Sequence, residues 1–143
     1  MTEPTPTTST DLTELDPFDL PEWLGVAEVT WTAESGVRTG HHVRGELAAD
    51  GFAPLPCDLL AVDEACPVPV ADDAVRVSAH HAWQRGEVHV VDSAGRLTLA
   101  VPGIRFSADL ALDALGRLAR AVGASPDRYA ARLRIGTDRG RRP

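Results

Sequence analysis

The sequence contains no lysine, only two cysteines and no long hydrophobic run. Because a membrane-spanning helix needs about 20 consecutive apolar residues, the sequence predicts none. The Thr- and Pro-rich start also lacks the charged and apolar regions of a signal peptide. Cys57 and Cys66 form no CxxC pair, and we expect both thiols to be reduced. These absences predict a cytoplasmic protein that needs neither a membrane nor a disulfide.

All fourteen basic residues are arginine, and charge is distributed unevenly along the chain. Residues 1–75 carry fifteen acidic side chains against two arginines, whereas residues 76–143 carry twelve arginines against six acids. Either the two halves attract each other within one fold, or one of them meets a partner. We favour attraction within the fold. A net charge of −7 opposes binding to nucleic acid, which we do not expect.

The length of 143 residues suits one domain with a polar segment at each end. Residues 1–18 form an acidic arm, and residues 136–143 form a basic tail; their composition predicts that both are disordered. We expect residues 19–135 to fold as a single α+β domain.

Alternating apolar residues and turn signals predict the strands of this domain. The expected strands are a hairpin over 25–32 and 37–47 with its turn at 34–36, a buried central strand at 57–62, a second hairpin over 88–91 and 97–101, and an edge strand at 129–135.

Two helices complete the predicted order β-β-β-α-β-β-α-β. Residues 108–122 have the strongest amphipathic pattern, and Gly123 can end this helix. Residues 72–85 fit both helical and strand periodicity; we choose a helix because Asp72 or Asp73 can cap it and Gly86 can end it. We therefore predict an antiparallel sheet of five to six strands, with the long helix packed on one face and the shorter helix at its margin.

Phe18, Leu20 and Trp23 are apolar residues that stand among acidic ones before the first strand. Such a segment can dock on a partner protein, or it can pack on its own domain. The first interpretation makes these three the candidate partner-binding residues.

Asp58 is the one charged residue in the apolar run 57–62. Burial disfavours a charged carboxylate, and carboxylates perturbed in this way cluster at active sites. Backbone N–H groups of the preceding turn would satisfy the same side chain without any catalytic role. An active-site cleft would instead need a histidine beside Asp58: His41, His80 or His81.

The five histidines include the neighbouring pairs His41-His42 and His80-His81. Neighbouring side chains diverge on a strand or a helix, so each pair offers one convergent ligand at most. A metal site that joins His41, His80 or His81 to Cys66 and Asp58 is the alternative; we predict no metal and no cofactor. The sequence also lacks GxSxG, GxGxxG and P-loop motifs.

The stretch GRLTLAVPG at 95–103, with the Ala-, Leu- and Arg-rich helix after it, resembles small uncharacterised proteins of high-GC actinobacteria. This resemblance covers Leu15–Ile135, includes no catalytic motif and implies no activity. The order of elements is also similar to that of secretion-chaperone-like α+β domains, which bind partner proteins as dimers.

Taken together, these patterns predict a non-enzymatic protein-interaction or accessory module that binds a protein partner or forms a homodimer. The alternative is a small enzyme or ligand-binding protein with Asp58 and a histidine in a cleft. Fold alone does not decide between them.

Overall fold

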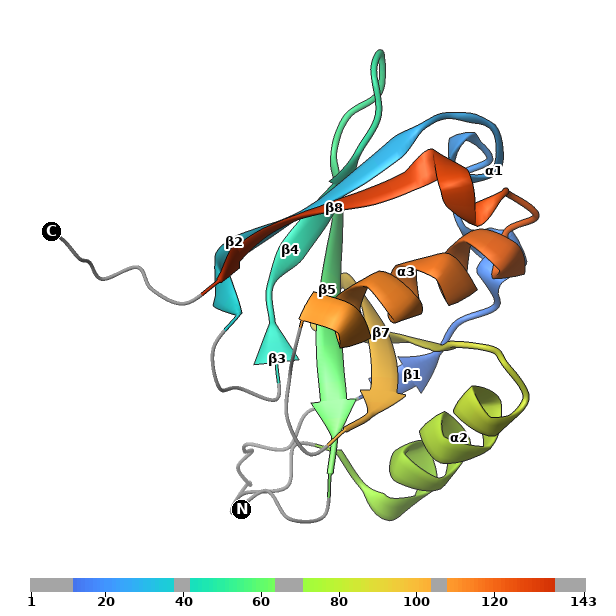
Figure 1. Cartoon of the computed structure of the whole chain (residues 1–143). Coiled ribbons are helices and arrows are strands. Elements are labelled where there is room, and N and C mark those ends of the chain that lie inside the picture. Colours follow the sequence, from blue (N-terminus) through green and yellow to red (C-terminus); the bar gives the residue numbers. More distant parts are fainter. Residues whose placement is uncertain (1–11, 38–41, 64–70, 104–107, 136–143) are drawn as a thin grey trace, which may run out of the picture.

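The computed structural model describes residues 12–37, 42–63, 71–103 and 108–135 (Figure 1). In chain order the elements are β1 (Leu12–Glu14), η1 (Pro17–Asp19), α1 (Trp23–Val26), β2 (Val29–Val37), β3 (His42–Val43), β4 (Gly45–Ala48), β5 (Leu55–Val62), α2 (Asp73–Gln84), β6 (His89–Ser93), β7 (Arg96–Pro102), α3 (Ala108–Ala121), η2 (Pro126–Arg128) and β8 (Tyr129–Ile135).

The strands form one mixed sheet of eight strands in the order β1-β6-β7-β5-β4-β2-β8, with β3 paired to β5. Most neighbours are antiparallel, but β5–β7 and β2–β8 are parallel. The α+β class is therefore confirmed, whereas the prediction of an antiparallel sheet of five to six strands needs correction. Residue alternation predicts strands but not their neighbours, and both parallel pairs depend on long crossovers through helices.

The N-terminal part differs most from the predicted boundaries. β2 continues through the expected turn at 34–36, because its pairing with β8 shifts between Thr32 and Gly36 and leaves a bulge there. The connection to β3 therefore falls at 38–41, outside the described residues. The folded region also includes Leu12–Glu14, which pairs with β6 as β1, so the domain begins before residue 19 and takes in part of the predicted arm.

Helix α3 covers one face of the sheet, as predicted. In Figure 1 it lies between β2–β8 and β5–β7, so that the sheet curls around it. Its buried Leu115 and Leu118 join a core cluster with Trp31 of β2, Leu59 of β5 and Leu99 of β7. This cluster is the main hydrophobic core.

Helix α2 covers part of the opposite face of the sheet, so the choice of a helix for residues 72–85 is confirmed. The Asp72 carboxylate accepts the Val75 N–H at 2.9 Å, as an N-cap should. Val75 and Ala79 pack against Leu60 of β5, whose side chain points away from the main core because neighbouring strand residues alternate. The short helix therefore lies on a second face, not at the margin of the first.

Trp31 fixes the contact between β2, β4 and β5. Its indole is fully buried, and Nε1 donates to the carbonyl oxygen of Cys57 at 2.7 Å. A Cβ atom at Gly45 would lie 2.6 Å from the indole ring. Only glycine therefore leaves room for the tryptophan at this point.

Gly45→Ala should lower the free energy of unfolding by about 1–3 kcal/mol, because the indole is held by its hydrogen bond and cannot move away. Gly116→Ala is the matched control, since a Cβ there has its nearest neighbour 4.0 Å away. In the interior of α3 it should stabilise by up to about 1 kcal/mol. Urea unfolding of both variants tests this, and equal effects would contradict the proposed clash.

Candidate functional site

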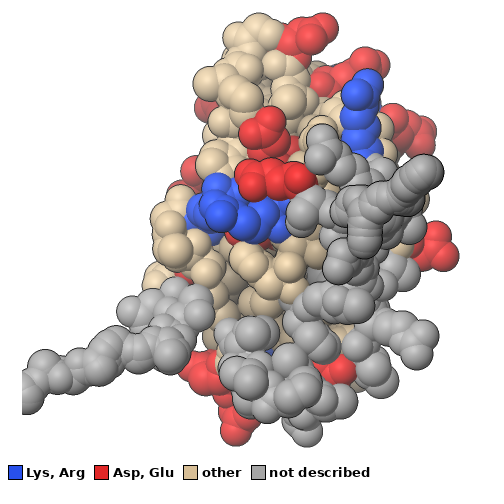
Figure 2. All heavy atoms as spheres, turned by 90° about the vertical axis from the view of Figure 1, so that its left-hand side faces the viewer, with Lys and Arg blue, Asp and Glu red and all other residues tan. Residues whose placement is uncertain are grey.

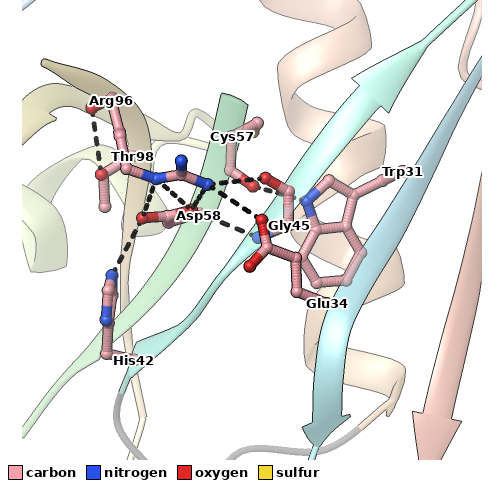
Figure 3. Close-up of polar contacts among 8 residues, drawn as sticks. All are labelled: Trp31, Glu34, His42, Gly45, Cys57, Asp58, Arg96 and Thr98. Carbon is pink, nitrogen blue, oxygen red and sulfur yellow. Dashed lines mark hydrogen bonds and ion pairs between the residues drawn. The ribbon is translucent and has the colours of Figure 1, made fainter. Parts of the chain in front are cut away.

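Asp58 lies at the centre of a polar network on the second face of the sheet, beside the area that α2 covers (Figure 3). The guanidinium of Arg96 on β7 donates to both carboxylate oxygens, at 2.9 Å from Nη2 and 3.0 Å from Nε. His42 Nε2 of β3 donates to Oδ2 at 3.1 Å. The backbone N–H of Gly45 on β4 donates to Oδ1 at 3.2 Å.

The same arginine makes a second contact with β4 and extends the network to β2. Its Nη2 donates to the carbonyl oxygen of Gly45 at 3.1 Å and lies 3.7 Å from the Glu34 carboxylate of β2. Arg96 thus joins the basic second half of the chain to the acidic first half, as the uneven charge favours. On the face drawn in Figure 2, basic side chains lie directly beside acidic ones, so its described residues offer no continuous basic surface.

The surroundings of Asp58 stabilise its charged form. Burial by itself raises the pKa of this carboxyl group, but the hydrogen bonds from His42, Arg96 and Gly45 outweigh burial and lower the pKa from 3.8 to about 2. The Asp58 side chain is only 2% exposed, whereas His42 is 43% exposed. A ligand could therefore meet this network only through His42 and the partly exposed Arg96 and Glu34.

The histidines predicted for the alternative cleft lie elsewhere. His80 and His81 are exposed on α2, and His41 is outside the described residues. His42, the neighbour that the prediction passed over, contacts Asp58 instead. Strand alternation was a usable signal, because one member of the pair 41–42 has to face the same side of the sheet as the Asp58 side chain.

The structure gives no support to metal or thiol chemistry in its described part. Among residues 12–37, 42–63, 71–103 and 108–135, no three His, Cys, Asp or Glu side chains come together as metal ligands. Cys57 is free and fully buried, and burial raises its pKa well above the ordinary thiol value. The other predicted ligand, Cys66, lies outside the described residues.

An apolar groove of about 400 Å³ lies where η1 and α1 meet the C-terminal end of α3. Phe18 stands at this groove and is 85% exposed, and Val26 is 68% exposed. The groove is lined by Pro17, Phe18, Leu20, Pro21, Glu22, Gly25, Val26, Val122 and Gly123.

The three predicted partner-binding residues therefore have different environments. Phe18 projects into solvent, and Leu20 lines the groove while packing against the main core. Trp23 instead stacks on Phe52, with ring centroids 5.3 Å apart. The segment thus packs on its own domain through Leu20 and Trp23, while Phe18 stays exposed, so docking on a partner protein stays a prediction.

Comparisons with protein-family models, with curated proteins and with solved structures found no match to this chain. The actinobacterial resemblance thus stays a prediction. None of the helices in the described ranges has the length and hydrophobicity to cross a membrane.

Replacing Arg96 should destabilise the protein far more than replacing His42. Arg96→Met would leave a buried carboxylate without its guanidinium, which typically costs about 3–5 kcal/mol. His42→Ala removes a partly exposed partner and should cost about 1 kcal/mol or less. Urea unfolding measures both, and a larger loss in His42→Ala would contradict the geometry of the network.

Asp58 should also make stability depend on acid pH. Because its folded pKa of about 2 lies below the ordinary value of 3.8, its contribution is complete above pH 3.8 and is lost as the pH falls towards 2. The loss should amount to about 2 kcal/mol. The ¹³C shift of the Asp58 carboxyl group, followed against pH, gives the folded pKa directly; a midpoint at or above 3.8 would contradict this assignment.

Proposed function

We propose that this protein is a non-enzymatic interaction module that binds a segment of a partner protein in the groove between η1, α1 and α3. The observation that carries the proposal is Phe18, a large apolar side chain that is 85% exposed beside a hollow of about 400 Å³. Large apolar side chains grouped on a surface in this way mark contact sites.

The groove is built on a rigid support, which reduces the conformational entropy lost on binding. A Cβ at Gly25 would lie 2.8 Å from the Val122 carbonyl oxygen, so α1 sits directly against the end of α3. The Arg128 side chain donates to the Val26 carbonyl oxygen at 2.7 Å, and the Tyr129 hydroxyl donates to the Leu24 carbonyl oxygen. Two carbonyl oxygens of the short helix are thereby held.

Charge around the groove indicates the chemistry of the partner. Asp16, Asp19 and Glu22 are exposed on the same segment as Phe18. Arg128 carries the opposite charge, but its guanidinium already donates a hydrogen bond to α1. We infer a partner segment with one or two large apolar side chains flanked by Arg or Lys. A second copy of this chain suits the groove less well, because two acidic rims would repel each other.

The alternative of a small enzyme rests on the His42–Asp58 contact. Both oxygens of Asp58 already accept hydrogen bonds from Arg96, so the carboxylate is one half of an ion pair inside the protein. The structure offers a complete structural role for Asp58, and we therefore base the proposed function on the groove.

Phe18→Ser should weaken binding of the selected peptides at least about tenfold, because an exposed aromatic anchor carries much of the energy of such an interface. Selection of short random peptides on the purified protein should enrich sequences with an apolar residue flanked by Arg or Lys. Isothermal titration calorimetry of the enriched peptides against both proteins then gives the affinities.

Val77→Ser is the matched control, since Val77 is 51% exposed but lies on α2. This variant should bind the same peptides as the unchanged protein. Both substitutions should alter stability by no more than about 0.5 kcal/mol, as exposed positions do. Enrichment of acidic peptides, or equal binding by Phe18→Ser, would overturn the proposal, and concentration-dependent dimerisation lost in that variant would replace the partner by a second copy.

A further inference from the structure

A second hollow, of about 300 Å³, lies between α2 and the edge formed by β1 and β6. None of the residues that carry the proposed function except Pro17 borders it. Its polar and charged lining comes from Glu14, Ser78, His81, Arg85, Glu87 and His89. Its volume is at the lower end of those that hold small ligands.

His89 is the buried polar group of this hollow. Its side chain is 9% exposed, and among the described residues its Nε2 atom has no hydrogen-bond partner. The nearest carboxylate oxygen, Oε2 of Glu14, is 3.7 Å from Nε2, which is too far for a hydrogen bond. A buried polar atom left unsatisfied is unfavourable, so a ligand that bonds to Nε2 would gain from it.

Burial also lowers the pKa of His89, and this effect outweighs the opposite influence of Glu14. The imidazole is therefore neutral at pH 7. A neutral imidazole can adopt either tautomer, and in the form with its proton on Nδ1 the unsatisfied Nε2 can accept a hydrogen bond from a ligand.

The charges around the hollow favour a cation. Arg85 is already engaged, since its Nε and Nη2 atoms donate to Glu87 Oε1 at 3.3 and 3.2 Å. Among the described residues of the lining, this pairing leaves the Glu14 carboxylate as the uncompensated charge. His81 and Arg85 also stand at the C-terminal end of α2, where the helix dipole is negative.

We propose that this hollow binds an alkylammonium group, which donates to the Glu14 carboxylate and to Nε2 of His89. A primary ammonium has three N–H donors, and the Ser78 hydroxyl on the same lining can accept the third. The described residues of the lining include no aromatic cage of the type that holds quaternary ammonium ions. The group belongs either to a free amine or to a lysine side chain.

The test uses the full-length protein labelled with ¹⁵N-histidine and titrated with n-butylammonium. The His89 ring signals should shift saturably, with a dissociation constant on the order of millimolar, as expected for so small a ligand. Signals of His80, which is exposed and lies outside the lining, should not move. Tetramethylammonium has the same charge without N–H donors and should cause no saturable shift.

Glu14→Gln should weaken binding at least about tenfold, because it removes a charge-assisted hydrogen bond from an exposed side chain. Glu28→Gln is the matched control, an exposed acid outside this lining. Affinity should fall with decreasing pH, because protonation of His89, which faces the Glu14 carboxylate, removes the acceptor at Nε2 and places a positive charge beside the ammonium group. N-acetyl-lysine methylamide distinguishes the sources: tighter binding than n-butylammonium assigns the group to a protein side chain, and weaker binding assigns it to a free amine.

Three results would overturn the proposal: no saturable His89 shift, an equal response to tetramethylammonium, or unchanged affinity in Glu14→Gln. The tetramethylammonium comparison needs no variant, so it holds even if a substitution disturbs the fold. The outcome is independent of peptide binding at the Phe18 groove.

Discussion

The ion pair between Asp58 and Arg96 is the interaction on which the arrangement of the sheet depends. β5 is covered on one face by α3 and on the other only partly by α2, so Asp58 lies buried where helix packing ends. A charge in that position has to be compensated locally. Arg96 does this from the neighbouring strand and, through the carbonyl oxygen of Gly45, also holds β4. The register of three strands is thereby fixed by one carboxylate, and the glycine it bonds is the residue that admits Trp31 on the opposite side.

The internal hydrogen bonds of Asp58 affect where a ligand can bind to the protein. The Asp58 network is saturated by internal hydrogen bonds, whereas the groove beside Phe18 and the hollow beside His89 each leave a group without an internal partner among the described residues. One of these groups is an apolar ring in water and the other a polar atom out of water. Both are unfavourable in the isolated protein, and each is relieved by a different kind of contact. The two proposed binding places thus lie at the periphery, whereas the saturated polar network lies in the interior.

Those parts of the fold that depend on local signals could be predicted from the sequence. The capping Asp72, the stripe of α3 and the apolar run of β5 each act within a few residues, and all three elements are present. The partner of Asp58 could not be predicted in this way, because Arg96 is 38 residues away and adjacent only through the parallel β5–β7 pair. The Glu34–Gly36 segment has turn-forming residues but is a bulge, since β8 pairs beyond it. Exposure of Phe18 and stacking of Trp23 likewise depend on neighbours distant in the chain.

The parallel pairing of β8 with β2 has a consequence for how the protein is made. Leu24 and Val26, which support the groove, are held by Tyr129 and Arg128, more than a hundred residues later. During synthesis the first strands therefore emerge from the ribosome long before the side chains that anchor them. A chain that stops short of η2 lacks the outer neighbour of β2 and the anchors of α1. The groove proposed to bind a partner is thus supported by these contacts only after residue 129 has been translated, and truncated products would lack that support.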